Sequence, residues 1–155
     1  MRIDPAVIRP SQTALVVVDM VRDFTDPDGL VFYPMNRQIL PAVVRLVDLC
    51  HQTGTLVIFM QHRYRSGKYD RNLETMRPNC IEGSGGEALD PALPVDRERD
   101  YIIQKRRYSA FYGTDLDLVL REHGIKNVAV VGTKTNCCIR ATVHDAYFKD
   151  RKSVV

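Results

Sequence analysis

Two adjacent cysteines in a strand–turn–helix pattern are the residues of this sequence best suited to chemistry. Residues 130–149 begin as an apolar run, pass through a polar turn that holds Cys137 and Cys138, and continue with apolar residues at helical spacing. A thiol there meets the positive end of a helix dipole, which tends to lower its pKa and to make it more nucleophilic. The pattern does not decide between the two cysteines, and most free cysteines are simply small buried apolar residues.

Asp19 and Lys105 are further candidates because each is predicted to lie at the end of a strand. Residues 14–18 are a β-branched apolar run, typical of a strand buried on both faces, and Asp19 follows directly. Residues 101–103 are predicted to be another, shorter strand that ends near Lys105. Ligands of open α/β sheets bind outside the carboxyl ends of the strands, although Asp19 could instead cap a loop.

A parallel sheet would bring Asp19, Lys105 and the cysteine pair together. A thiolate, a carboxylate that moves its proton and a cation that favours both anions form a nucleophilic site. Such a site suits acyl transfer from an amide.

The spacing of apolar and turn-forming residues along the rest of the chain predicts strands and helices in alternating order, and these elements would position the candidate residues. Glycine and proline between residues 78 and 94 predict a long irregular connection, whose GSGG stretch lacks the spacing of a phosphate loop. The expected elements are a helix over residues 37–51 with Pro41 in its first turn and Gly54 at its end, a strand over 55–59, a polar loop over 61–70, a helix from Thr114 to Gly124, a strand over 127–131 and a strand starting at 153–155.

Composition and charge exclude several classes of protein. The chain of 155 residues is 45% hydrophobic and 26% charged, which is ordinary for one globular domain. Its net charge of +3 is scattered without a basic block, so nucleic acid is not an expected partner. No apolar run approaches the roughly eighteen residues of a membrane span, and no signal peptide pattern opens the chain. The sequence therefore predicts a cytoplasmic protein with no membrane partner.

The four cysteines show neither a CxxC pair nor a paired Cys/His spacing. Neither a zinc site nor a thioredoxin-type motif is therefore expected. In a reducing compartment, all four should be free thiols.

With these residues in view, the chain resembles the isochorismatase-like cysteine hydrolases. This superfamily includes nicotinamidases, N-carbamoylsarcosine amidases, ureidoacrylate amidases and biuret hydrolases. The matching pieces are ALVVVDMVRDF, KRRYSAFYGTDLDLVLREHGI and VVGTKTNCCIRATVHDA, in the family's order and over most of residues 13–155. The resemblance implies an α/β fold, a three-layer αβα sandwich with a mainly parallel, Rossmann-like central sheet.

The resemblance also implies roles for individual residues. The family's catalytic Asp, Lys and Cys match Asp19, Lys105 and Cys138, because the family's nucleophile directly precedes a V/I-x-x-T pattern, here residues 139–142. Cys137 then fills a variable position.

A cis peptide bond is implied between Thr133 and Lys134. The backbone N–H groups of Lys134 and Cys138 would then form an oxyanion hole.

Three departures from the family pattern shape the expectations. The common DMQNDF is DMVRDF here, which changes the loop after Asp19. Nicotinamidases of the family carry an Asp-x-His metal site after the second strand, where this chain has Gln61-His62-Arg63. We therefore expect no metal and no other cofactor, and nicotinamidase activity is less expected. The usual strand and helix after the catalytic helix are absent beyond Val155, so residues 1–155 are expected to be a single hydrolase domain lacking them.

The sequence thus predicts a metal-free cysteine amidohydrolase that acts on a small amide, ureide or N-carbamoyl compound. The resemblance implies a homo-oligomer, either dimer or tetramer. Isochorismatase-type vinyl-ether hydrolysis is an alternative that Cys138 argues against, since that chemistry uses no cysteine nucleophile. A catalytically silent binding or oligomer-forming member of the fold is another. Candidate substrate-binding residues are Phe24, Arg63, Arg106, Arg107 and Asn136, with the arginines as anchors for an anionic substrate or as solvated surface charge.

Overall fold

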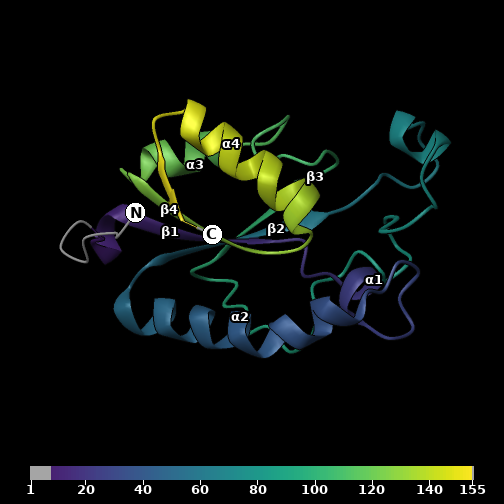
Figure 1. Ribbon diagram of the computed structural model, residues 1–155, viewed down its shortest axis with the longest axis horizontal. Coiled ribbons are helices and arrows are strands. Elements are labelled where there is room, and N and C mark those ends of the chain that lie inside the picture. The colour runs from purple at the N-terminus through teal and green to yellow at the C-terminus, as the bar shows by residue number, and fades with distance from the viewer. Residues whose placement is uncertain (1–7, 155) are drawn as a thin grey trace.

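Five parallel strands form the centre of the computed structural model, which describes residues 8–154 (Figure 1). Their order in the sheet is β3-β2-β1-β4-β5, so the first strand of the chain lies in the middle. Every neighbouring pair is parallel, and all the carboxyl ends therefore lie at one edge. The strands are β1 (Thr13–Val18), β2 (Leu56–His62), β3 (Tyr101–Lys105), β4 (Asn127–Gly132) and β5 (Lys152–Val154).

Helices cover both faces of this sheet, which confirms the predicted three-layer αβα fold (Figure 1). The long α2 (Pro34–Thr53) and the short α1 (Arg22–Thr25) lie on one side, and α3 (Leu116–Glu122) and α4 (Arg140–Phe148) lie on the other. The chain also has two short 3-10 helices, η2 (Pro10–Gln12) and η3 (Arg71–Glu74), and a π-helical turn, η4 (Thr135–Ile139), within the described residues.

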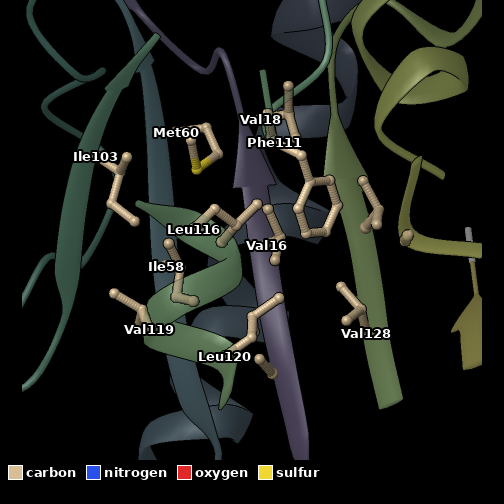
Figure 2. Close-up of a cluster of buried hydrophobic side chains, with 14 of the residues drawn as sticks. Val16, Val18, Ile58, Met60, Ile103, Phe111, Leu116, Val119, Leu120 and Val128 are labelled. Carbon is tan, nitrogen blue, oxygen red and sulfur yellow. The ribbon is translucent and has the colours of Figure 1, made fainter. Parts of the chain in front are cut away.

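The alternation of side chains along each strand divides the core into two clusters. Leu15 and Val17 of β1 face α2 and pack with its Leu40, Val43 and Val47. The other cluster lies between the sheet and the α3 side (Figure 2). Its labelled members are Val16, Val18, Ile58, Met60, Ile103, Phe111, Leu116, Val119, Leu120 and Val128. Since β1 is buried on both faces, its end is a rigid place for a functional residue.

Some element boundaries differ from the predicted ones. β2 and β3 extend to His62 and Lys105, because these two residues pair across the strands, so residues 61 and 62 are not in a loop. α2 begins at Pro34, which places Pro41 inside the helix rather than in its first turn. Pro41 is exposed, so the backbone hydrogen bond that it cannot make is lost on the solvent side. α3 begins at Leu116, two residues after Thr114.

The predicted fifth strand exists as β5, one residue earlier than expected, and it pairs with β4 from Asn127 to Ala129. Val155 lies outside the described residues. Within residues 8–154, no helix combines the length and the apolar character needed to cross a membrane.

Candidate active site

Asp19, Lys105 and Cys138 meet at the carboxyl edge of the sheet. Asp19 follows β1, Lys105 is the last residue of β3, and Cys138 lies in η4 after β4. Lys105 Nζ is 2.7 Å from Asp19 Oδ2, and both side chains are fully buried. Cys138 is also buried, with 8% of its surface exposed. The sequence prediction that these three residues come together is therefore realised in the fold.

The backbone at Asp19 turns the carboxylate away from the strand direction. Asp19 has a φ of 55°, in the left-handed region, and its N–H donates to the carbonyl of Met60 at 2.9 Å. Aspartate is one of the few residues that adopt this conformation readily. The Asp19 carboxylate contacts the Cys138 thiol as well as Lys105, so it is placed to take the thiol proton.

The charges of this cluster are strongly coupled. Burial and, after it, the Asp19 carboxylate raise the pKa of Cys138 to about 12, while Lys105 opposes the shift. Burial disfavours the Lys105 ammonium, but Asp19 and Cys138 outweigh burial and raise the pKa of Lys105. The expectation of a lowered thiol pKa from a helix dipole was therefore wrong. Cys138 lies in the π-helical turn η4, before α4 begins at Arg140, and burial is the dominant effect.

Besides Asp19, Lys105 has a side-chain hydrogen bond with Cys138 and two further hydrogen-bond partners. Its Nζ donates to the carbonyl of Arg107 at 2.9 Å and to Nδ1 of His62 at 3.4 Å. The His62 ring packs edge-on against Tyr64 at a centroid distance of 4.7 Å and lies 6.2 Å from the ring of Phe24. Phe24, a predicted substrate-binding residue, is thus half-buried beside the imidazole that contacts Lys105.

The turn between β4 and the cysteines is closely packed against the end of β1. Gly132 has a φ of 118°, and a Cβ there would lie 2.1 Å from the carbonyl oxygen of Val18. The Thr133 N–H donates to that same carbonyl at 3.0 Å, and Thr133 Oγ1 donates to Asn36 Oδ1 of α2 at 2.6 Å. The peptide bond between Thr133 and Lys134 is cis, as the resemblance implies.

Lys134 supplies the carbonyl that organises η4. This carbonyl accepts hydrogen bonds from the N–H groups of Cys137 at 3.1 Å and Ile139 at 3.2 Å. The Lys134 N–H finds no acceptor among residues 8–154. It is therefore free to bind an oxygen atom from outside the chain.

Thr142 explains the I-x-x-T pattern after the nucleophile candidate. Its hydroxyl donates to the carbonyl of Cys138 at 2.7 Å and accepts from the N–H of Ala110 at 3.0 Å. This side chain therefore ties the turn that holds Cys138 to the loop after β3.

Three of the predicted substrate-binding residues line a cavity of about 410 Å³ with Lys105. These are Arg63, Arg106 and Arg107, beyond the ends of β2 and β3. Each arginine also has a carboxylate partner. Arg63 lies 2.6 Å from Glu82, while Arg106 and Arg107 lie 3.1 and 3.0 Å from the same carboxylate, that of Asp70.

Asn136 lies on the Lys134 side of the site, away from the arginines. It is exposed and lines a separate cavity of about 820 Å³, between the start of α2 and α4. The structure therefore does not bring Asn136 together with the three arginines.

Sequence reasoning missed three residues around the site. His62 contacts Lys105, Asn36 holds Thr133, and Asp70 anchors both Arg106 and Arg107. A longer prediction for the second strand would have placed His62 at the carboxyl edge. Asn36 and Asp70 act over long sequence separations, and no local pattern marks them.

The residues at the family's metal position do not fit a metal ion. Gln61 donates to the carbonyl of Glu87 at 2.8 Å, Arg63 is cationic, and His62 Nδ1 accepts from the Lys105 ammonium. Within residues 8–154, no group of three His, Cys, Asp or Glu side chains could hold a metal. All four cysteines are free thiols.

Comparisons with known proteins found similar sequences and a similar fold. The isochorismatase domain family matches residues 13–155. A probable inactive nicotinamidase of Arabidopsis thaliana is 35% identical over 150 residues, which cover 92% of this chain and 76% of that protein. A ureidoacrylate amidohydrolase of Acinetobacter baylyi is 30% identical over 175 residues, which cover 96% of this chain and 71% of that protein. The crystal structure of a cysteine hydrolase from Pseudomonas syringae pv. phaseolicola superposes with a TM-score of 0.88 at 28% identity, covering 94% of this chain and 70% of that one.

Proposed function

Because the chain belongs to the isochorismatase family, we propose that it is a cysteine amidohydrolase that cleaves the C–N bond of a small amide, ureide or N-carbamoyl compound. The observation that carries the proposal is the buried Lys105–Asp19 ion pair beside the Cys138 thiol. The name of one relative supports the reaction class, since a ureidoacrylate amidohydrolase is similar to this chain.

The first half of the reaction forms a covalent intermediate. The raised pKa keeps the Cys138 thiol protonated at rest, so Asp19 takes its proton as Sγ attacks the substrate carbonyl carbon. Lys105 balances the negative charge that develops on Sγ. The N–H groups of Lys134 and Cys138 hold the oxyanion. Asp19 then protonates the departing nitrogen, the C–N bond breaks, and ammonia or an amine leaves.

The second half releases the product. An amide leaves a thioester on Cys138, and a ureide or N-carbamoyl compound leaves a thiocarbamate. Water attacks this carbonyl carbon while Asp19 takes one of its protons. The C–S bond breaks, and the proton returns to the sulfur of Cys138.

The basic cavity beside Lys105 favours a substrate with a negatively charged group at the end remote from the scissile bond. The pairing of Arg106 and Arg107 with a single carboxylate leaves a net positive charge there. Arg65 and Lys68 line the same cavity and have no ion-pair partner among residues 8–154. A carboxylate is the simplest group that such a cavity would bind.

A catalytically silent member of the family is the alternative, because one similar relative is a probable inactive nicotinamidase. Asp19, Lys105 and Cys138 are all present and in contact here, and this supports activity.

The test is ammonia release from a panel of small amides and ureides, with Cys138→Ala and Cys137→Ala compared with the native chain. Release that is lost in Cys138→Ala and kept in Cys137→Ala supports the proposal and assigns the nucleophile. The panel includes N-carbamoyl-β-alanine and n-propylurea, which share a ureide and differ in the remote carboxylate, and the charged member should react faster. Release that survives Cys138→Ala contradicts the cysteine mechanism, and release from no panel member favours the silent alternative.

We also propose that the protein acts in the cytoplasm as a homo-oligomer. Four free thiols suit a reducing compartment. Sedimentation of the purified chain would determine the oligomeric state, with a monomer contradicting the proposal.

A further inference from the structure

Beside the Cys138 thiol, the Lys105 ammonium lies among three nitrogen and oxygen acceptors from three parts of the chain. Asp19 Oδ2 is at 2.7 Å, the carbonyl of Arg107 is at 2.9 Å and His62 Nδ1 is at 3.4 Å. An ammonium group donates three hydrogen bonds and accepts none, so His62 must accept through an unprotonated Nδ1. The proposed mechanism uses Lys105 and Asp19 and gives His62 no role.

We propose that His62 is a positioning residue, whose neutral imidazole holds the Lys105 ammonium against Asp19 and Cys138. Asp19 and the Arg107 carbonyl accept two protons of the ammonium. Without His62, the third proton has only the sulfur of Cys138 beside it, and a thiol sulfur is a weak acceptor. The imidazole gives the third proton a stronger nitrogen acceptor than this thiol, and the end of the long flexible side chain is thereby fixed.

Backbone pairing sets the position of the imidazole. His62 and Lys105 are register partners on the parallel strands β2 and β3, so their side chains leave the sheet on the same face. Tyr64 contacts the ring edge-on, the Phe24 ring lies near it, and only 6% of His62 is exposed. Packing against neighbouring side chains therefore fixes the orientation of the ring.

The charges around His62 suit an uncharged acceptor. Two ion pairs lie around the ring, Lys105 with Asp19 and Arg107 with Asp70, so the positive and negative charges near the imidazole offset one another. Burial lowers the pKa of His62 to about 4, with Asp19 opposing the shift and Lys105 adding to it. The imidazole is therefore neutral near pH 7. An imidazolium could not accept from Lys105 and would repel it.

Loss of this acceptor should free Lys105 to move away from the thiol. Lys105 lowers the pKa of Cys138, so its displacement raises that pKa further and reduces the thiolate at a given pH. A shift of one unit changes the thiolate fraction about tenfold. Misplacement of a catalytic group by about 1 Å costs on the order of 100-fold in rate, and the loss should fall on kcat rather than on KM.

The experiment compares His62→Phe, which keeps a ring without an acceptor, with His62→Asn, whose amide oxygen can replace Nδ1. His123→Phe is the matched control, since His123 hydrogen-bonds Tyr101 at 2.9 Å and lies outside the site. All variants carry Cys137→Ser, so that iodoacetamide labelling of the peptide reports Cys138 alone. The readouts are the labelling rate at pH 8, kcat and KM for a panel substrate, and the melting temperature.

We expect labelling of Cys138 to slow about tenfold in H62F and to stay within about threefold of the native rate in H62N and H123F. A native labelling rate in a folded H62F overturns the inference. Equal losses of labelling rate in H62F and H62N also overturn it. If H62F does not fold, H62L replaces it with the same expectations.

The kinetic part rests on the proposed function, but the labelling does not. Slower labelling of H62F in a chain that hydrolyses nothing would support the role of His62 and reject the amidohydrolase.

Discussion

The buried ion pair between Lys105 and Asp19 gives the sharpest prediction about stability. The two side chains are fully buried with 2.7 Å between Nζ and Oδ2, so neither charge is screened by water. Removing one partner of such a pair leaves an uncompensated buried charge and typically costs about 3–5 kcal/mol. Replacing both partners with uncharged groups of similar shape is often close to neutral.

Lys105→Met and Asp19→Asn keep the approximate size of each side chain, and asparagine also tolerates the left-handed backbone of position 19. We expect each single variant to lower the free energy of unfolding by about 3–5 kcal/mol at pH 7.5. The double variant should lose less than either single variant. The coupling free energy between the two sites should then be at least about 3 kcal/mol.

Urea unfolding of the native chain, both single variants and the double variant measures this coupling. The pH dependence provides an internal check. In Lys105→Met, the buried unpaired carboxylate binds a proton more tightly than the unfolded chain does, so stability should recover as the pH falls from 7.5 to 5. The double variant, with no carboxylate at this position, should lack this recovery.

Two results would refute the reasoning. If the free energy of unfolding of Lys105→Met lies within about 1 kcal/mol of the native value, Asp19 is not an unpaired buried charge in the variant. Purely additive losses in the double variant would mean that the two side chains do not interact.

Two further predictions concern the last residue of β4 and the turn that follows it. Gly132→Ala should lower the free energy of unfolding by more than about 2 kcal/mol, because its Cβ would overlap the Val18 carbonyl at 2.1 Å in addition to the strained φ. Gly54→Ala is the control, with a φ of 72° and no atom near its Cβ, and equal losses by urea unfolding would contradict the overlap argument. Because its pKa is raised to about 12, Cys138 should be alkylated by iodoacetamide at a rate that rises steadily from pH 7 to 10. A plateau below pH 9, measured in Cys137→Ser, would show that this thiol has an ordinary or lowered pKa.

The strand-end positions of the three central residues could be predicted from the sequence. Asp19 and Lys105 follow apolar runs, and the cysteine pair follows another. A parallel sheet places all carboxyl ends at one edge, so local pattern and topology together are enough to bring these residues near one another. The residues alone left the choice between Cys137 and Cys138 open, and the resemblance selected Cys138.

The environment of these residues could not be predicted in the same way. The thiol pKa was expected to be low because the local pattern showed a helix start, but burial by distant segments raises it. The contacts of His62 with Lys105 and of Asn36 with Thr133 join residues far apart in the chain. No periodicity or spacing encodes such pairs.

The connection between residues 78 and 94 illustrates the same division. Its glycines and prolines predicted an irregular segment, and apart from isolated bridges the structure has no strand or α-helix there. Only the folded chain shows that Asp23 accepts from the Cys80 N–H at 2.6 Å and leaves no room for a Cβ at Gly86.

The sequence by itself thus determined the order of the elements, the parallel sheet and the edge at which the reactive groups lie. These follow from periodicity and chain connectivity, which are local properties. The tertiary structure alone decided which groups are desolvated, which charges are paired and how Lys105 is held, because burial and pairing depend on segments that meet only when the chain folds.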